Sequence, residues 1–292
     1  MRHYLSNECE VRHGGLPIAN RAVLVYAGIE LAPPRLSFRL VTPFNIALLM
    51  ATGFLAGTSN ALVGGGTLFS FPILIAVGMA PVTAVTTNMT ALWPGLITSA
   101  YAYREQLQRA REGMPARIGV AFAGGLTGAV LLLLSGDALF SKLVPWLLAG
   151  GTFLFTFAKP LVRHVVRASP EKRALGPLLV MEFFCAIYGG YFTAGIGILL
   201  LAAMALAGEH NMQSANAQRN FLVCFITGTA IVIYVAMGKV DWFVAPILMA
   251  GSITGGYIGA RIAKYIPGEW LRRLITLAGA TFAVAAFIKV YG

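Results

Sequence analysis

The sequence predicts an all-α integral membrane protein made of two inverted structural repeats, each a glycine-broken hairpin segment followed by three transmembrane helices. Three observations support this class: an apolar composition, two apolar runs interrupted by glycine, and short motifs that recur along the chain. The chain is 58% hydrophobic and 11% charged, with a mean hydropathy of +0.75. A soluble protein of 292 residues could not bury that much apolar surface, because folded domains keep a large exposed area.

The charge pattern predicts a multi-pass membrane protein, and we expect its membrane to be the inner (cytoplasmic) cell membrane of a bacterium. The net charge is +11, and the Lys and Arg residues lie in short clusters between apolar spans. This distribution follows the positive-inside rule and argues against a nucleic-acid partner. Cys9, Cys185 and Cys224 lack metal or redox spacing, so we expect no metal and no cofactor. The expected partners are the lipid bilayer and a small anionic substrate, and the plan allows a homodimer.

Residues 1–39 form a polar N-terminal tail with one weakly apolar piece, Ala22 to Ala32. Eleven residues cannot span a bilayer, so this piece is either an interfacial helix or part of a disordered tail. A cleaved signal peptide is disfavoured, because Glu8 and Glu10 would lie in its positively charged region.

Two apolar runs are broken by glycine where a helix should continue. The first, Leu40 to Tyr103, has 64 residues without a charged side chain or histidine and contains Gly64-Gly65-Gly66-Thr67-Leu68. The second, Ala174 to Gly208, has Glu182 as its only charge and contains Gly195-Ile196-Gly197. A backbone break inside a membrane span is tolerated only where it faces protein or a water-filled cavity. The two breaks therefore indicate a transport pathway.

Three motifs recur in the same order, at offsets of 131, 127 and 129 residues. They are Gly64-x-Gly66-x-Leu68 with Gly195-x-Gly197-x-Leu199, Ala123-Gly124-x-x-Thr127-Gly128 with Ala250-Gly251-x-x-Thr254-Gly255, and Leu148-Ala149-Gly150-x-Thr152-Phe153 with Leu277-Ala278-Gly279-x-Thr281-Phe282. Such collinear matches indicate duplication. We expect close helix packing at the small residues Gly124, Gly128, Gly251, Gly255 and Gly259.

The first membrane repeat is predicted at 40–160 and the second at 177–292. The first contains a broken segment at about 45–79 and spans at about 82–103, 116–135 and 143–160. The second contains a broken segment at about 177–207 and spans at about 217–238, 242–260 and 272–290.

Loop charges set the relative orientation of the halves. The loop after the first span carries four arginines in half one, Arg117 among them, but only Lys239 in half two. The next loop reverses this bias, with only Lys142 in half one. Equivalent loops of the two halves are therefore expected on opposite sides of the membrane, with the basic connector 161–176 in the cytoplasm. Each broken segment must then enter and leave on the same side, as a hairpin. The same count of spans places the Arg-bearing N-terminal tail on the outer side of the membrane, which is contrary to the positive-inside rule.

Inside the membrane, the helices restarting at Thr67 and Ile198 would aim their N-termini at one place. Unpaired backbone N–H groups and the partial positive charge of a helix N-terminus make an anion site. We expect the substrate to be bound by Asn60, Gly64, Gly65, Gly66, Thr67, Thr87, Asn88, Tyr191, Gly195, Gly197, Gln218, Arg219 and Asn220.

Two charged residues have open alternatives. Arg219 begins an uncharged run and could bind an anion as a bidentate donor, or it could extend to the lipid headgroups from the interface. Glu182 lies in an apolar stretch, where an ionised acid costs about 2.5–3.5 kcal/mol if deep. It could be protonated and serve proton coupling, or pair with a basic residue of the connector.

The glycine run and the polar patch after it resemble a known signature. The residues are Gly53-Phe54-Leu55-Ala56-Gly57, Gly64 to Leu68, Pro72 and Gly78 to Asn88. They are similar to the first signature of the TauE/SafE sulfite exporter family, with Thr87-Asn88 where members often have Thr-Ser. The second half keeps Gly195-Ile196-Gly197 but has Ala217-Gln218-Arg219-Asn220 in place of the usual patch. The resemblance covers about 44–290 and implies an eight-segment permease that exports sulfite, sulfonates or related oxyanions.

The main hypothesis is therefore a secondary transporter of a small anion, working by alternating access around the two breaks. A passive anion channel is the alternative, because polar groups at mid-depth are compatible with a continuous pore. An intramembrane enzyme is disfavoured, since no histidine lies inside a span and Glu209-His210 has no second ligand at the metal-binding spacing.

Overall fold

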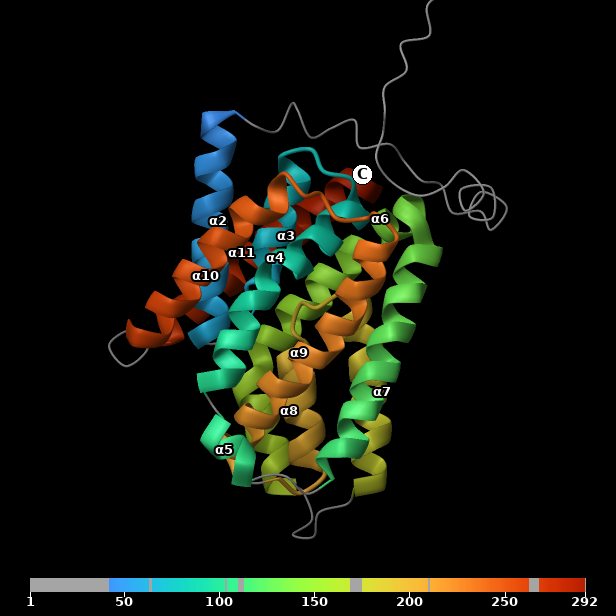
Figure 1. Ribbon diagram of the computed structural model, residues 1–292, viewed down its shortest axis with the longest axis vertical. Coiled ribbons are helices and arrows are strands. Elements are labelled where there is room, and N and C mark those ends of the chain that lie inside the picture. Colours follow the sequence, from blue (N-terminus) through green and yellow to red (C-terminus); the bar gives the residue numbers. More distant parts are fainter. Residues whose placement is uncertain are drawn as a thin grey trace, which may run out of the picture. The chain divides into compact units, whose positions relative to one another are not determined.

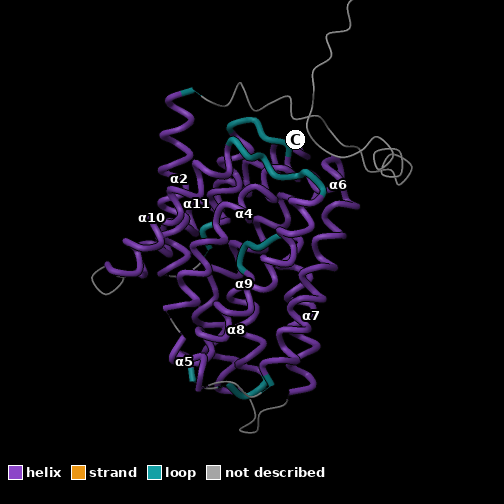
Figure 2. The backbone as a smooth tube through the Cα atoms, viewed as in Figure 1, coloured by secondary structure: helices purple, strands orange, loops and turns teal. Residues whose placement is uncertain are grey.

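The computed structural model describes residues 42–62, 65–102, 104–109, 113–168, 175–209, 211–262 and 268–291, and within these ranges it contains helices and no strands (Figures 1 and 2). The chain divides into two units, 1–33 and 34–292, and the first lies outside the described residues. The predicted tail, 1–39, also lies outside them. The helices of the second unit are α2 (Pro43–Leu62), α3 (Thr67–Ala76), α4 (Pro81–Ala102), α5 (Arg104–Arg109), α6 (Met114–Ala168), α7 (Leu175–Tyr191), α8 (Ile196–Leu206), α9 (Met212–Ala236), α10 (Val244–Ile262) and α11 (Gly268–Tyr291).

Both predicted breaks are present. α2 ends at Leu62 and α3 begins at Thr67, while α7 ends at Tyr191 and α8 begins at Ile196, two residues before the expected Ile198. Gly65 and Gly195 have φ angles of 83° and 82°, a left-handed conformation that glycine adopts without a Cβ penalty. These two glycines allow the chain to leave one helix and start the next.

The predicted spans 116–135 and 143–160 both lie in α6. Only Gly136 inside α6 departs from helical geometry, with φ 59° and ψ 178°. The expected loop at 136–142 was therefore wrong: residues 137–142 are helical and the chain turns at a single glycine. Asp137 stabilises this turn, because its Oδ1 accepts a 2.9 Å hydrogen bond from the Val82 backbone N–H. The C-terminal part of α6 continues to Ala168, into the basic stretch, and residues 169–174 lie outside the described ranges.

Glycine lets four of the helices approach closely in two pairs, α2 with α10 and α6 with α7. A Cβ added to Gly255 would lie 2.0 Å from the Phe54 carbonyl oxygen, and one added to Gly128 would lie 2.1 Å from that of Ile187. A Cβ added to Gly251 would lie 2.3 Å from the Met50 carbonyl oxygen, and one added to Gly124 would lie 2.5 Å from the Ala186 Cβ and 2.9 Å from the Phe183 carbonyl oxygen. The expected close packing is confirmed at these four glycines, and Gly259 lies in α10.

Contacts between distant residues define two ends of this unit. At the first, here called the Asp137 end, the start of α4 meets the turn at Gly136 and the loop between α9 and α10. At the second, called the Arg117 end, the start of α6 meets α7 and the start of α9, and α9 meets Glu209 in the connection from α8. α2 runs alongside α10 in the same direction, since Gly53 faces Leu248 and Gly57 faces Ser252. The hairpin α2–α3 therefore opens toward the Asp137 end, and α7–α8 opens toward the Arg117 end.

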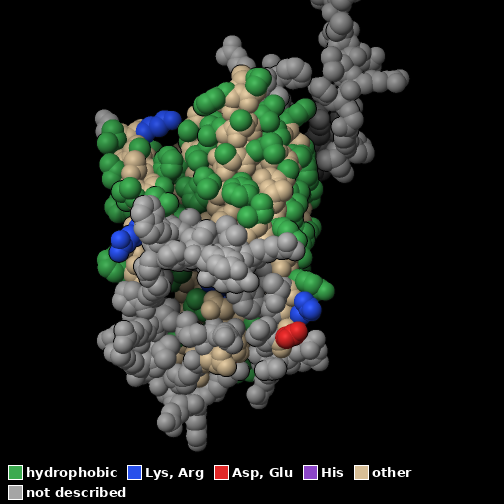
Figure 3. Space-filling model, turned by 90° about the vertical axis from the view of Figure 1, so that its left-hand side faces the viewer, with side chains coloured by type: hydrophobic (Ala, Val, Ile, Leu, Met, Phe, Trp, Pro, Cys, Tyr) green, Lys and Arg blue, Asp and Glu red, His purple; other side chains and the backbone are tan. Residues whose placement is uncertain are grey.

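The surface of this unit is largely apolar. Large side chains such as Leu134, Phe184, Val232 and Leu277 are about two-thirds exposed. On the face drawn in Figure 3, hydrophobic side chains cover most of the described surface, and the few charged ones lie near its edges. Within the described ranges, three helical stretches are long and apolar enough to cross a membrane: Met114–Phe157, Ser214–Ala236 and Arg273–Tyr291. The described part of the chain is all-helical, which is consistent with a membrane protein.

Candidate anion site between the two helix breaks

The first break is held by side chains on both of its flanks. Asn60, near the end of α2, accepts a 2.9 Å hydrogen bond from the Gly66 N–H through Oδ1. The Ser70 hydroxyl, in the first turn of α3, lies 2.9 Å from the Gly66 carbonyl oxygen and 2.7 Å from Oδ1 of Asn88. The Gly66 peptide is thus fixed at both its N–H and its C=O, so the start of α3 has a defined orientation.

Asn88 supports this arrangement from α4. Its side chain is fully buried, and its Nδ2 has no hydrogen-bond partner among the described residues. A buried amide donor without a partner is costly, and such groups call for an explanation. Asn88 therefore contacts the first break through Ser70, while its own NH₂ group has no partner among the described residues.

The second break is held by Tyr188. Its hydroxyl donates a 2.6 Å hydrogen bond to the carbonyl oxygen of Ala194, just before the left-handed Gly195. The amide of Ile198 then bonds to the Gly195 carbonyl oxygen, which closes the first turn of α8. The α8 start is consequently fixed by a residue of α7, just as the α3 start is fixed by a residue of α2.

Both breaks line one cavity of about 70 Å³. A water molecule needs about 10–15 Å³ by this measure, so the cavity has room for several waters or one small polyatomic anion. Seven predicted site residues line it: Asn60, Gly65, Thr67, Gly195, Gly197, Arg219 and Asn220. The lining also includes the apolar side chains of Met89, Leu92 and Phe155.

Arg219 lies at the centre of the polar lining. A Cβ built on Gly197 would stand 3.2 Å from Arg219 Cδ and 3.4 Å from Nη1, so the side chain lies against the first turn of α8. Arg219 Nε and Nη2 donate hydrogen bonds of 3.1 and 2.8 Å to Asn220 Oδ1. Asn220 thereby restrains the guanidinium beside the cavity.

The backbone also contributes donors. Among the described residues, none accepts a hydrogen bond from the amides of Thr67 and Gly197, which stand in the first turns of α3 and α8. The N-terminus of a helix carries a partial positive charge equivalent to about half an elementary charge. One guanidinium and two helix N-termini therefore give the cavity a positive potential.

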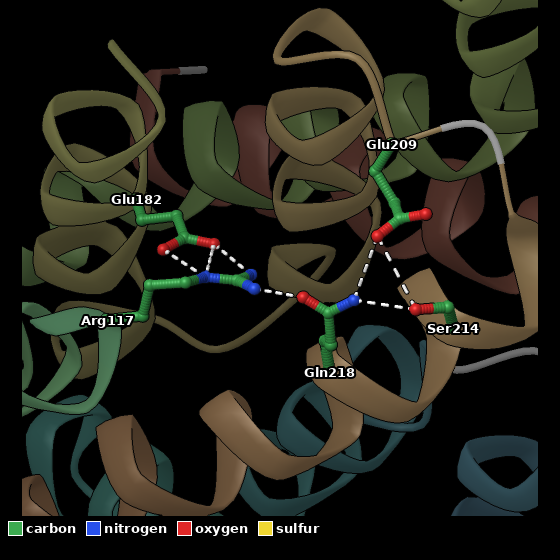
Figure 4. A network of polar contacts seen from close by, with 5 residues as sticks. All are labelled: Arg117, Glu182, Glu209, Ser214 and Gln218. Carbon is green, nitrogen blue, oxygen red and sulfur yellow. Dashed lines mark hydrogen bonds and ion pairs between the residues drawn. The ribbon is translucent and has the colours of Figure 1, made fainter. Parts of the chain in front are cut away.

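A second polar group lies at the start of α9 (Figure 4). Glu182 of α7 makes an ion pair with Arg117 of α6, and both side chains are buried. Arg117 donates from Nη1 to Gln218 Oε1, and Gln218 Nε2 donates to Glu209 Oε2 at 3.0 Å and to Ser214 Oγ at 2.8 Å. We call these five residues the Arg117 network. Among the described residues no cluster of His, Cys, Asp or Glu could hold a metal ion.

The other predicted site residues do not line the cavity. The Thr87 hydroxyl accepts a hydrogen bond from the Asp241 N–H, and the Tyr191 hydroxyl donates to Ser135 Oγ. Gln218 belongs to the Arg117 network. Gly66 bonds to Asn60 and Asn88 bonds to Ser70, so both hold the first break without lining the cavity. Gly64 lies outside the described residues. Glu182 is paired with Arg117, which the sequence analysis had assigned to a loop.

Some residues of the cavity and of the Arg117 network were not predicted, and they differ in how far the sequence could have indicated them. Phe155 and Met89 are apolar, and nothing distinguishes them from other lipid-span residues in the sequence. Thr227 lines the cavity from α9, two turns beyond Arg219, and its spacing on one helix face was a usable signal. Arg117 and Glu209 flank predicted spans, where charge suggested a loop rather than a buried network.

A family model and several curated relatives match the chain. A family model described as Sulfite exporter TauE/SafE matches residues 49–286. A probable membrane transporter protein of Haemophilus influenzae is 32% identical over 236 residues, covering 80% of this chain and 90% of the relative. The probable membrane transporter protein YfcA of Escherichia coli K12 is 22% identical over 258 residues, covering 88% and 94%. The corresponding protein ORF9 of a Sinorhizobium species is 25% identical, covering 82% and 91%. No solved structure matches the chain.

Proposed function

The chain belongs to the TauE/SafE sulfite exporter family, and on that premise we propose that it is a secondary transporter of a small anion. The substrate class is sulfite, an organosulfonate such as sulfoacetate, or a related sulfur oxyanion. The binding site is the cavity between the two helix breaks.

One observation carries this proposal: Arg219 lies against the first turn of α8. A guanidinium and a helix N-terminus both carry positive charge, so an anion placed between them would be stabilised by both. A fixed guanidinium matches the oxygen geometry of an oxyanion through paired N–H donors. The amides of Thr67 and Gly197 supply further donors from the two breaks.

The strength of these donors suits a carrier. A helix N-terminus contributes about 0.3–1 kcal/mol when exposed and up to about 2 kcal/mol when partly buried. Two such termini and one arginine bind an anion without holding it so tightly that release becomes slow. Release matters because a transporter must give up its substrate on the other side.

The arrangement of the hairpins supports inverted repeats and alternating access. The hairpin α2–α3 opens toward the Asp137 end and α7–α8 toward the Arg117 end. Gly124 and Gly251, which occupy equivalent positions in the repeated motif, pack against the first helix of the hairpin from the other half. Reciprocal packing of this kind, in which each half contacts the hairpin of the other half, is expected where two repeats are related by an axis in the membrane plane.

The orientation follows from charge. The Arg117 end includes the arginine-bearing loop between α4 and α6, so the positive-inside rule assigns it to the cytoplasm. Export, the direction in the family's name, then carries the anion from the Arg117 end to the Asp137 end. The membrane is the cytoplasmic membrane of a bacterium, and Glu182 is the candidate for proton coupling.

Flux in liposomes tests the proposal. The reconstituted chain is expected to move labelled sulfite or sulfoacetate with saturable kinetics, and unlabelled anion on the far side should accelerate exchange. Arg219→Ala should lower the flux roughly tenfold or more, the factor for losing a charged hydrogen bond. Arg104→Ala removes an exposed arginine whose contacts are with Tyr101, so it serves as the matched control.

Two outcomes would contradict the proposal. If neither anion crosses faster than through empty liposomes, and Arg219→Ala changes the flux of no anion tested, the site is wrong. If flux does not saturate and single-channel currents appear, the protein is a passive anion channel instead.

A further inference from the structure

The Arg117 network joins three helices at one point. Gln218 of α9 accepts a hydrogen bond from Arg117 of α6 and donates to Glu209, which follows α8 (Figure 4). Arg117 is held in turn by Glu182 of α7, whose carboxylate accepts from both Nε and Nη2. The network is one continuous chain of donors and acceptors, from one carboxylate to the other.

The charges fix the orientation of the bridging amide. The Gln218 carbonyl oxygen faces a cation, and its NH₂ group faces an anion. Turning the amide over would point the NH₂ at Arg117 and the oxygen at Glu209, and both contacts would become repulsive. The contact between Gln218 and Arg117 therefore persists only while the starts of α6 and α9 stay together.

The network lies between the cavity and the Arg117 end. Along α9 the cavity is lined by Arg219, Asn220, Val223 and Thr227, all beyond Gln218. Ser214, the other member on α9, stands one turn nearer to the start of the helix. Along α9, the network therefore stands between the cavity lining and the start of the helix.

A matching contact exists toward the Asp137 end. Thr87 precedes Gln218 by 131 residues, the offset of the repeated glycine motif, so the two positions are equivalent in the two halves. The Thr87 hydroxyl accepts a 2.9 Å hydrogen bond from the Asp241 N–H, in the loop between α9 and α10. The neighbouring Thr86 hydroxyl donates to the Lys239 carbonyl oxygen in the same loop.

We propose that Gln218 with Arg117, and Thr87 with Asp241, are two latches at equivalent positions that close the cavity toward opposite ends. The proposal rests on the proposed function, since latches of this kind serve alternating access. One latch joins the start of α9 to the start of α6. The other joins the start of α4 to the loop that precedes α10. Opening one while the other stays closed gives the anion access to one side of the membrane only.

The two latches differ in strength. Gln218 bonds to a charged guanidinium, whereas Thr87 bonds to a neutral backbone amide. Charge-assisted hydrogen bonds are about twice as strong as neutral ones. The cavity should therefore open more readily toward the Asp137 end in the absence of substrate.

Thiol labelling tests the latches without any substrate. The background carries Cys9→Ser, Cys185→Ala and Cys224→Ala, and Val223→Cys places one reporter in the cavity lining. A charged, membrane-impermeant methanethiosulfonate is added to right-side-out and to inside-out membrane vesicles. With both latches intact, labelling should be faster from the Asp137 end. Because no anion is transported, failure of the latches is distinguished from failure of the proposed transport.

Three variants separate the two latches. Gln218→Leu should raise labelling from the Arg117 end roughly tenfold, the factor for one charge-assisted hydrogen bond, and leave the other end unchanged. Gln218→Glu combined with Glu209→Gln keeps an acceptor for Arg117 and a donor–acceptor pair between positions 218 and 209, so labelling from that end should stay near the original rate. Thr87→Val should raise labelling only from the Asp137 end, by about fivefold.

The proposal is overturned if Gln218→Leu and the exchanged pair Gln218→Glu with Glu209→Gln act alike, or if either latch variant raises labelling equally from both ends. Equal labelling from the two ends with both latches intact would also overturn it. That last comparison needs no latch variant, so it decides the matter even where a substituted protein fails to fold.

Discussion

Arg219 of α9 lies against Gly197 in the first turn of α8, with its Cδ 3.2 Å from the place where a Cβ of residue 197 would stand. The contact exists because residue 197 has no side chain. It brings a guanidinium to a helix N-terminus, and it explains why a glycine is needed one residue inside a helix whose backbone there is regular.

Gly197→Ala tests this relationship. The added methyl group pushes the guanidinium away from the cavity, because 3.2–3.4 Å is tighter than an ordinary contact. We expect the KM for the transported anion to rise roughly tenfold, which corresponds to about 1.4 kcal/mol. Gly150→Ala is the control, because nothing lies within 4 Å of its Cβ position. An unchanged KM in the Gly197 variant would contradict the assigned role of Arg219.

Asn60→Ala tests the support of the first break. The substitution removes the acceptor of the Gly66 N–H, so the start of α3 loses one of its two fixed points. A neutral hydrogen bond is worth about 1 kcal/mol, and we expect anion affinity to fall about fivefold. Asn45→Ala, in the first turn of the same helix, should leave the affinity unchanged. Equal losses in the two variants would indicate a general effect on α2.

The buried ion pair gives a prediction for stability. Arg117→Met leaves Glu182 without its cation, and breaking a buried pair from one side costs about 3–5 kcal/mol. The double variant with Glu182→Met removes both charges and should recover most of this loss. Thermal unfolding of the purified protein in detergent measures both. If the double variant is as unstable as the single one, the pair contributes through something other than charge.

Gly255→Ala tests the packing of α2 on α10. The new Cβ would stand 2.0 Å from the Phe54 carbonyl oxygen, so the helices must separate. Overpacking of this kind costs about 1–3 kcal/mol. We expect a lower Tm than for Gly150→Ala, which adds a methyl group in open space. Matching Tm values would mean that the two helices yield without cost.

The sequence predicted the elements that depend on local chemistry. The breaks were predictable because glycine is the residue that adopts positive φ, and Gly65 and Gly195 do so. The turn at Gly136 was placed too broadly, since one glycine is enough to reverse the chain when Asp137 can accept a hydrogen bond beside it.

Partners distant in the sequence were not predictable in the same way. Glu182 and Arg117 are 65 positions apart, and counting loop charges gives no depth in the membrane, so Arg117 was assigned to a loop. Gln218 and Arg219 were both expected to line the cavity. Consecutive residues of an α-helix point about 100° apart, since a turn has 3.6 residues, so they face different neighbours. The structure brings Arg219 to the cavity and Gln218 to Arg117.

The central claim is that both helix breaks and Arg219 form one anion site. An experimental structure with bound selenite, an anomalous scatterer with the shape of sulfite, tests it most directly. We predict one selenium peak in the cavity, within hydrogen-bond reach of the Arg219 guanidinium and of the amides of Thr67 and Gly197. A peak elsewhere in the protein, or α7 and α8 running on as a single unbroken helix, would contradict the account.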